Sequence, residues 1–282
     1  MPRTYLGIIT GSFSTPAIDN PTVVAMEAAY RHHGLDARYL NCEIAKTDLA
    51  AAVAGARAMH WAGFNCSIPH KVAVIDLIDG LAASAEIIGA VNCVVATGEG
   101  LIGHNTDGQG FVAALTPVRA PAGANVVVLG TGGAARAVAI ETALAGAASI
   151  TLVGRVADEA TTLGRYVTQA TGVTAYGVPW DGSYAVPPTT DVLVNATSVG
   201  LGDPDAMVDI DVATLRPGLV VSDVIVSAIP TAFVRAAREA GATALDGVGM
   251  MVGQGAVNFR LWTGLEPDRE VMRAALEATL AE

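Results

Sequence analysis

A short glycine-rich segment carries the residue pattern with the clearest chemistry. Residues 126–129 are apolar and mostly β-branched, which predicts a short buried parallel strand followed by a turn and an alanine-rich helix. Glycine lets a backbone approach a pyrophosphate, and a helix N-terminus offers unpaired N–H groups to an anion. The spacing is that of the dinucleotide-binding fingerprint, so it predicts a nicotinamide-cofactor site rather than an ordinary tight turn. The residues of this turn are Gly130, Gly132, Gly133, Ala134 and Ala135.

The charge after the next expected strand, at 149–153, bears on which dinucleotide binds. That strand ends at Gly154 and Arg155. An arginine there suits the 2′-phosphate of NADP, whereas an acidic residue suits the free ribose of NAD. Arg155 therefore favours NADP, and the nearby Asp158 and Glu159 keep NAD open.

A lysine and an aspartate could supply acid–base chemistry. Lys71 ends the segment 65–71, where Pro69 forces a turn after an apolar strand. An isolated loop lysine is commonly a solvated charge, but Asp107 stands where the chain is expected to cross between domains. An ion pair of the two would position the ammonium group for proton transfer to a forming alkoxide, as the oxidation or reduction of an alcohol requires. This chemistry needs no metal, and the sequence shows no metal-ligand spacing.

Alternating strands and helices must position these residues. We expect strands at 5–10, 37–41, 61–68, 90–95, 101–107, 126–129, 149–153, 175–178, 192–195, 220–224 and 243–245, and helices at 21–33, 48–59, 72–79, 134–147, 253–263 and 268–281. This alternation predicts an α/β fold with a mixed first part and a fingerprint domain that starts at Gly108.

Composition excludes several classes of protein. The chain has 282 residues, of which 52% are hydrophobic and 15% charged, enough for two well-buried domains. A net charge of −11 without any basic run argues against a nucleic-acid partner. Cys42, Cys66 and Cys93 read as free thiols of a reducing compartment. With no signal peptide and no apolar stretch of about 20 residues, we expect a cytoplasmic protein without a membrane partner.

Six motifs, in order along nearly the whole chain, resemble those of the shikimate dehydrogenase family. Residues 65–71, Asn-Cys-Ser-Ile-Pro-His-Lys, are similar to that family's Asn-Val-Thr-x-Pro-x-Lys. The other five are residues 90–92, 105–108, 130–136, 195–200 and 247–254, and residues 261–264 resemble the family's ending. The resemblance implies an NAD(P)-dependent oxidoreductase that interconverts a cyclic hydroxy acid and its 3-keto form, as in aromatic amino acid biosynthesis.

The resemblance also implies a domain plan and roles for residues. A substrate-binding catalytic domain, residues 1–107 joined by helices in 249–282, would face a Rossmann-type NAD(P)-binding domain, residues 108–248, across a cleft. Lys71 and Asp107 would be the catalytic pair. Substrate would be bound by Ser67 (in place of a threonine), Asn92, Gln254 and Asn20, and the cofactor by Arg155, Thr197, Ser198, Val224, Gly247 and Met250 as well as the glycine turn. Asn92 could instead cap a turn, and Gln254 could be a surface residue of its helix.

The chain departs from the family where substrate is recognised. The family's two carboxylate-binding serines fall on Ile18 and Asn20, counted from Pro21, and a tyrosine falls on Val226. Loss of a hydrogen bond to a charged group costs roughly 1.5–3 kcal/mol, so such a pair is not replaced freely. Beside the shikimate reaction itself, these departures therefore leave open a divergent member that acts on a related substrate: quinate, an aminated analogue or another cyclic polyol acid.

Other readings stay open. A sensor of NADP or a metabolite could keep this fold without catalysis, and a folate-type dehydrogenase has a similar two-domain plan. The exact substrate, the physiological direction and the choice between a monomer and a homodimer are not set by the sequence.

Overall fold

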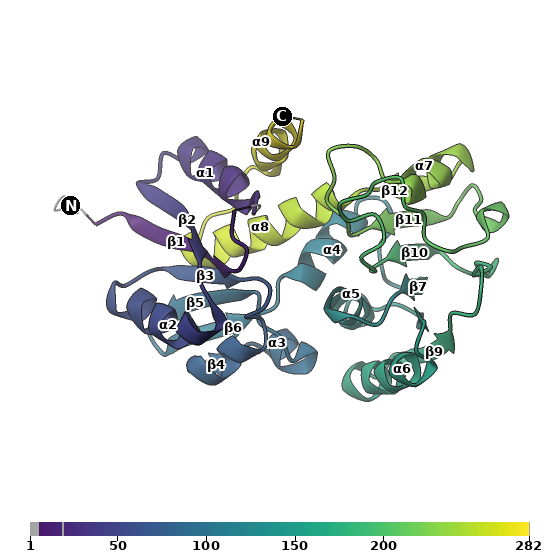
Figure 1. Cartoon of the computed structure of the whole chain (residues 1–282), viewed down its shortest axis with the longest axis horizontal. Coiled ribbons are helices and arrows are strands. Elements are labelled where there is room, and N and C mark those ends of the chain that lie inside the picture. The colour runs from purple at the N-terminus through teal and green to yellow at the C-terminus, as the bar shows by residue number, and fades with distance from the viewer. Residues whose placement is uncertain (1–5, 19, 282) are drawn as a thin grey trace. The chain divides into compact units, whose positions relative to one another are not determined.

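The structure, a computed structural model, describes residues 6–18 and 20–281. The chain divides into one unit of Met1–Thr106 with Gln254–Glu282 and a second of Asp107–Gly253 (Figure 1). The second unit is inserted between two segments of the first. Each unit has its own sheet, which confirms the predicted α/β class.

The sheet of the first unit is mixed, with the strand order β2-β1-β3-β5-β6-β4. β1 pairs in parallel with β2 and β3, whereas β5 is antiparallel to both of its neighbours. The strands are β1 (Ile8–Ser14), β2 (Ala37–Glu43), β3 (Gly63–Cys66), β4 (Gly80–Leu81), β5 (Cys93–Thr97) and β6 (Gly100–His104). The helices are α1 (Thr22–His32), α2 (Leu49–Ala58), α3 (Ala83–Ile88) and α9 (Arg269–Leu280), with the last part of α8 (Gly247–Thr263) and the 3₁₀ turns η1 (Lys46–Asp48) and η2 (Ala73–Leu77).

The two faces of β1 differ in polarity. Phe13 stacks on Phe64 with ring centroids 4.4 Å apart, in a hydrophobic cluster that includes Val53 of α2. Because side chains alternate along a strand, Thr10 and Ser12 lie on the opposite face, where both are buried. Buried hydroxyl groups need hydrogen-bond partners, so those of Thr10 and Ser12 must find partners inside the unit. The strand that carries them runs toward polar loops at its carboxyl end.

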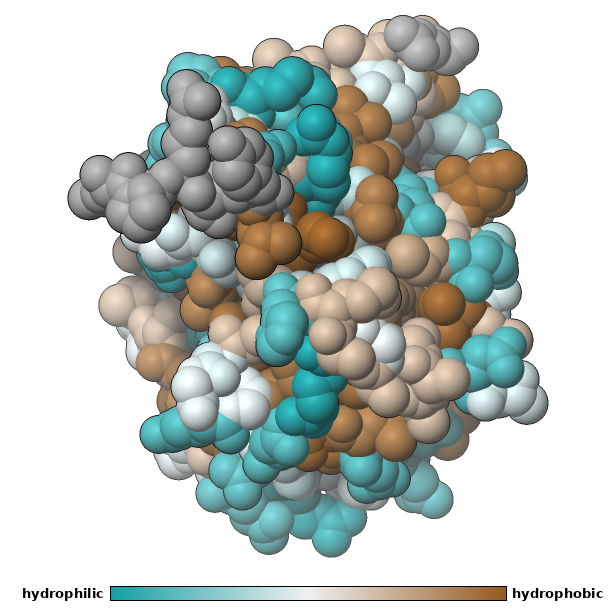
Figure 2. Space-filling view, turned by 90° about the vertical axis from the view of Figure 1, so that its left-hand side faces the viewer, coloured by the Kyte–Doolittle hydropathy of each residue, from teal (hydrophilic) through white to brown (hydrophobic). Residues whose placement is uncertain are grey.

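The surface near the first unit mixes polar and apolar side chains. Figure 2, which views the molecule from the left-hand side of Figure 1, shows hydrophobic side chains among hydrophilic ones. Single exposed apolar residues are normal on proteins. This face therefore assigns no partner by itself.

The sheet of the second unit is parallel throughout, in the order β12-β11-β10-β7-β8-β9. Its strands are β7 (Asn125–Leu129), β8 (Ser149–Gly154), β9 (Thr174–Pro179), β10 (Val192–Asn195), β11 (Val220–Asp223) and β12 (Thr243–Leu245). Its helices are α4 (Asp107–Leu115), α5 (Gly133–Leu144), α6 (Ala157–Thr171), α7 (Ala232–Glu239) and the first part of α8, with the 3₁₀ turn η3 (Val212–Thr214). This is the doubly wound dinucleotide-binding order, which reverses between β7 and β10, and it confirms the predicted Rossmann-type domain.

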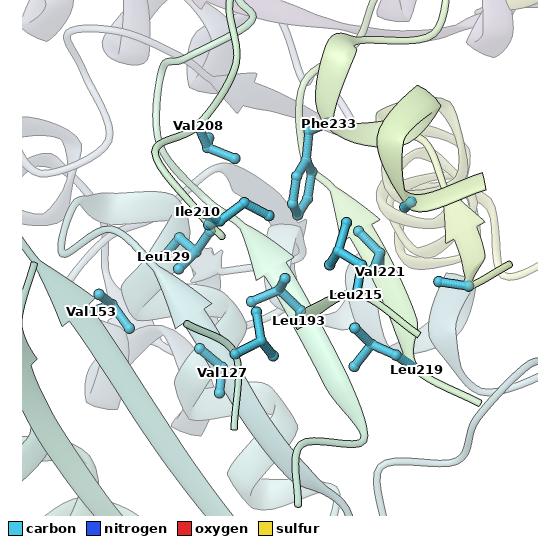
Figure 3. Close-up of a cluster of buried hydrophobic side chains, with 13 residues drawn as sticks. Val127, Leu129, Val153, Leu193, Val208, Ile210, Leu215, Leu219, Val221 and Phe233 are labelled. Carbon is cyan, nitrogen blue, oxygen red and sulfur yellow. The ribbon is translucent and has the colours of Figure 1, made fainter. Parts of the chain in front are cut away.

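One face of this sheet carries the core cluster drawn in Figure 3. Val127 and Leu129 of β7 are two residues apart, so they point to the same side as Leu193 of β10 and Val221 of β11. Phe233 of α7 covers them, together with apolar residues of the segment 208–219. This packing fixes the strand ends from which the nucleotide-side loops emerge.

Several predicted boundaries differ from the structure. The strand expected at 101–107 is β6, which ends at His104, the strand expected at 61–68 is the shorter β3, and the helix expected at 72–79 is the 3₁₀ turn η2. The first strand, expected at 5–10, runs over Ile8–Ser14, because the hydroxyl side chains that suggested a loop are buried in the sheet; Tyr5 lies outside the described residues. The helix expected from Gly253 begins at Gly247. Asp107 starts α4 and belongs to the second unit, as do residues 249–253, since Gly253 packs directly on the Gly110 backbone.

Candidate functional site

The turn between β7 and α5 is built for close approach to its backbone. Gly130 has φ +111°, and a Cβ there would lie 3.0 Å from the Ala196 carbonyl oxygen, so a side chain is excluded. A Cβ at Gly132 or Gly133 would meet no atom within 4 Å, so the start of α5 is open. Ala135 is fully buried. The predicted glycine-turn residues therefore form an open helix N-terminus at the switch point of the sheet, as a pyrophosphate requires.

The second unit contains a pocket of about 310 Å³ at the carboxyl ends of its strands. Three residues predicted to bind cofactor line it: Arg155 after β8, and Thr197 and Ser198 after β10. Sequence reasoning missed the rest of the lining, Trp180, Val199, Met207 and Asp209. Trp180 directly follows β9, so its place at the same edge of a parallel sheet was a usable signal.

Buried polar groups fix the conformation of the loop that carries Thr197. Asn195 accepts hydrogen bonds at Oδ1 from the Thr197 backbone N–H (3.1 Å) and from its hydroxyl (2.7 Å). Asn195 donates in turn to Asp223, which is 1% exposed and also accepts from the Thr231 hydroxyl. Burial raises the pKa of Asp223, and these hydrogen bonds partly oppose that rise. Asp223 was not among the predicted site residues.

The predicted nicotinamide-side residues come together at the start of α8. A Cβ at Gly247 would lie 2.3 Å from the Ile225 carbonyl oxygen and 2.8 Å from that of Val224, so only glycine lets α8 start there. Met250 lies one turn further along the same helix. A bound dinucleotide fits three features of this one unit: the glycine turn, the pocket lined by Arg155, and the contact of Gly247 with residues 224 and 225.

In the first unit, backbone hydrogen bonds gather the predicted substrate-side residues. The Lys71 carbonyl accepts from the Val91 N–H at 2.7 Å, and the Asn92 carbonyl accepts from the Cys66 N–H at 2.9 Å. Ser67 follows Cys66, so Ser67, Lys71 and Asn92 share one region at the ends of β3 and β5. Burial raises the pKa of the Cys66 thiol to about 12, and the nearby charge of Lys71 partly offsets that rise.

A chain of buried polar side chains joins Asn92 to Gln254. Thr106 donates its backbone N–H to Asn92 Oδ1 (2.7 Å) and its hydroxyl to Asn258 Oδ1 (2.7 Å). Asn258 donates to Gln254 Oε1 at 2.9 Å. Thr106 and Asn258, neither of them predicted, thus connect two predicted substrate ligands that are 162 positions apart in the numbering.

The loop that replaces the family's serine pair uses its amide for structure. Asn20 donates from Nδ2 to Ser12 (2.9 Å) and accepts at Oδ1 from the first N–H of α1, that of Thr22 (3.1 Å). Ile18 is 86% exposed. Substrate binding by Asn20 stays a prediction, and no hydroxyl stands at either position.

Lys71 and Asp107 belong to different units. Asp107 begins α4, directly after Thr106 of the buried polar chain. Their predicted pairing stays a prediction.

Across residues 6–18 and 20–281, no group of three or more His, Cys, Asp or Glu side chains is arranged to hold a metal ion. Within the same described ranges, each helix is too short or too polar to span a bilayer.

Comparison with known proteins places the chain in a family. Residues 19–94 match the shikimate dehydrogenase substrate binding domain, and residues 247–277 match the shikimate 5′-dehydrogenase C-terminal domain. A shikimate dehydrogenase (NADP(+)) of Geobacter metallireducens is 35% identical over 96% of each chain.

Two solved structures extend this comparison. The ligand-free 5-ketofructose reductase of Gluconobacter sp. strain CHM43 is 51% identical, with a TM-score of 0.95 over 98% of this chain and 100% of that one. Shikimate 5-dehydrogenase of Listeria monocytogenes, solved with shikimate and NAD, is 31% identical, with a TM-score of 0.88 over 97% of each chain. The resemblance seen in the six motifs is confirmed: this chain belongs to the shikimate dehydrogenase family.

Proposed function

We propose that the chain is an NADP-dependent oxidoreductase of the shikimate dehydrogenase type that reduces an uncharged polyhydroxy ketone, such as 5-ketofructose. The observation that carries the choice of substrate is the loop at Ile18 and Asn20. This loop lacks the hydroxyl pair that the family uses for a carboxylate, and the Asn20 amide already serves Ser12 and Thr22. The 51% identity to a 5-ketofructose reductase supports the same choice.

The choice of NADP rests on Arg155. Its side chain lines the pocket next to the glycine turn, where a guanidinium group suits a 2′-phosphate. Glu159, which kept NAD open, accepts a hydrogen bond from Thr131 of the turn at 3.1 Å. NAD remains the weaker alternative.

Lys71 and Asp107 handle the proton in this proposal. NADPH, when bound, supplies a hydride to the carbonyl carbon of the substrate. The Lys71 ammonium donates a proton to the carbonyl oxygen as it becomes a hydroxyl, and Asp107 stabilises and orients the lysine. Ser67, Asn92 and Gln254 bind the hydroxyl groups of the substrate, and the buried chain through Thr106 and Asn258 holds the two amides in place.

A second candidate is interconversion of shikimate and 3-dehydroshikimate. The full-length match to shikimate dehydrogenases (NADP(+)) and the shared motif at 65–71 favour it. The missing hydroxyl pair counts against it.

A substrate panel separates the candidates. Initial rates of NADPH and NADH oxidation would be measured with 5-ketofructose and with 3-dehydroshikimate, and the reverse reaction with shikimate and quinate. Because each lost bond to a carboxylate costs roughly 1.5–3 kcal/mol, we expect kcat/KM for the neutral ketone to exceed that for the acid by at least about tenfold. A higher kcat/KM with 3-dehydroshikimate would overturn the choice of substrate. NADPH binding without turnover of any of these compounds would support a sensor.

The compartment and the assembly complete the proposal. We propose a cytoplasmic protein that is a monomer or a homodimer. Sedimentation analysis of the purified chain distinguishes these two states.

A further inference from the structure

The pocket beside Arg155 has an apolar floor that the function proposed above does not explain. Trp180, Val199 and Met207 line the pocket and also pack against the core cluster of the second unit. The other lining side chains, Arg155, Thr197, Ser198 and Asp209, are polar. An apolar floor combined with a few polar side chains suits a flat ring that carries a charged substituent.

Trp180 is fixed within the second unit through both its backbone and its side chain. Its backbone N–H donates to the Gly154 carbonyl at 2.9 Å, and its indole Nε1 donates to the Asp209 carbonyl at 2.8 Å. Gly154 immediately precedes Arg155, so the first bond ties the tryptophan to the loop that carries the arginine. The indole N–H has its hydrogen-bond partner within the protein, so the ring is held in place without a ligand. When a ligand stacks on this ring, ordering the side chain therefore costs little entropy.

We propose that Trp180 is the platform for the adenine ring of NADP(H), with Arg155 on the 2′-phosphate of the same adenosine group. This inference rests on the proposed use of NADP. A purine offers a broad π-face, and stacking of a base on an aromatic ring contributes measurably to its binding. Met207 and Val199 extend the same apolar floor. Sequence reasoning overlooked Trp180, and a pocket for both an adenine ring and a phosphate explains why an indole lies beside an arginine.

Binding of 2′,5′-ADP, which carries the adenine and the 2′-phosphate without nicotinamide, tests the proposal by calorimetry. Trp180→Leu keeps an apolar floor but removes the ring, and Trp180→Phe keeps a ring. Tyr176→Ala is the matched control, because Tyr176 is a 57% exposed aromatic residue of β9 outside the pocket lining. We expect Trp180→Leu to weaken binding at least about fivefold, Trp180→Phe to retain most of the affinity, and Tyr176→Ala to change nothing.

Two further measurements separate stacking from a general loss of structure. Reduced nicotinamide mononucleotide lacks adenosine, so Trp180→Leu should leave its affinity unchanged, and with NADPH it should raise KM while kcat at saturation stays the same. Tryptophan emission should fall when 2′,5′-ADP binds the wild-type chain and should not respond in Trp180→Leu. The other tryptophans, Trp61 and Trp262, are each 7% exposed and belong to the first unit.

Equal affinity of wild type and Trp180→Leu for 2′,5′-ADP would overturn the platform and leave the proposed function intact. An equal loss of affinity for reduced nicotinamide mononucleotide would also overturn it, because the role would then be structural. If the wild-type chain bound neither NADPH nor 2′,5′-ADP, the proposed use of NADP would fail, and the platform with it.

Discussion

Asn195 donates a hydrogen bond of 3.0 Å from its side-chain amide to the carboxylate of Asp223, its direct register partner on the neighbouring strand. The same carboxylate accepts from the Ile225 N–H and the Thr231 hydroxyl. One buried carboxylate thus fixes the conformation of the loops that follow β10 and β11. The first of these loops carries Thr197, which lines the pocket next to Arg155.

Replacing Asp223 with alanine should destabilise the second unit and weaken NADPH binding. The donors from Asn195, Ile225 and Thr231 would be left buried without an acceptor, and each such loss costs roughly 1–3 kcal/mol. We expect the free energy of unfolding in urea to fall by at least about 2 kcal/mol. The control is Asp211→Ala, since Asp211 is an exposed residue that caps only the turn η3. An equal effect of the two substitutions would contradict the special role of Asp223.

Lys71→Met should abolish turnover while NADPH still binds. The chain has only two lysines, so Lys46→Met, in the surface turn η1, is a matched control for loss of one ammonium group. General acid–base catalysis contributes typically 10²–10⁴-fold, so kcat should fall by at least about a hundredfold in Lys71→Met and stay unchanged in Lys46→Met. Steady-state rates and calorimetric NADPH titration give both quantities. Near wild-type turnover in Lys71→Met would remove Lys71 from the mechanism.

The double variant Ile18→Ser, Asn20→Ser should shift substrate preference toward a carboxylate. It restores both hydroxyls at the positions where the family has them, and each bond to a charged group is worth roughly 1.5–3 kcal/mol. We expect kcat/KM for 3-dehydroshikimate to rise at least about tenfold relative to 5-ketofructose. Asn20→Ala alone serves as the control: it removes the amide that helps to order the start of α1 and adds no hydroxyl. The same ratio of kcat/KM values in all three proteins would exclude this loop as a specificity element.

Arg155→Ala should reduce the preference for NADPH over NADH. The guanidinium group is expected to contact only the 2′-phosphate, and a charge-assisted hydrogen bond is worth roughly 1.5–3 kcal/mol. KM for NADPH should therefore rise at least about tenfold, while KM for NADH changes little. Arg165→Ala, on the exposed part of α6, controls for loss of one positive charge. If both substitutions raised KM for NADPH equally, Arg155 would act only through net charge.

The three cysteines should differ sharply in alkylation. Burial raises the pKa of Cys66 to about 12, so at pH 8 almost none of this thiol is ionised, and Cys93 is fully buried. Cys42 is partly exposed, although burial raises its pKa as well. Mass spectrometry of the native protein after iodoacetamide should therefore find modification at Cys42 first. A Cys42→Ser variant should stay unmodified under the same conditions, and labelling of Cys66 in it would show that the first unit opens readily.

Local patterns in the sequence predicted the Rossmann-type domain well. The apolar run before Gly130 and the strands at 192–195 and 243–245 were found with the structure's own bounds or nearly so, because short buried strands between glycine turns are legible locally. Family motifs, rather than spacing alone, supplied the candidate residues at 195–200 and 247–250. Helices α3, α4, α6 and α7 were not predicted, because the burial of their apolar residues depends on the elements they pack against.

The sequence by itself determined the glycine turn, the arginine that follows β8 and the residue types of a proton-transfer pair, because each of these is a pattern within a few positions. Only the tertiary structure decided that β1 continues through Ser14, and that Trp180 and Met207 share a pocket with Arg155. It also decided that Thr106 and Asn258 join Asn92 to Gln254. The physical reason is the same in each case: segments distant in the chain determine which side chains are buried and which groups they hydrogen-bond. In the sequence alone, a hydroxyl, an amide or an indole is therefore easily taken for a loop or surface residue.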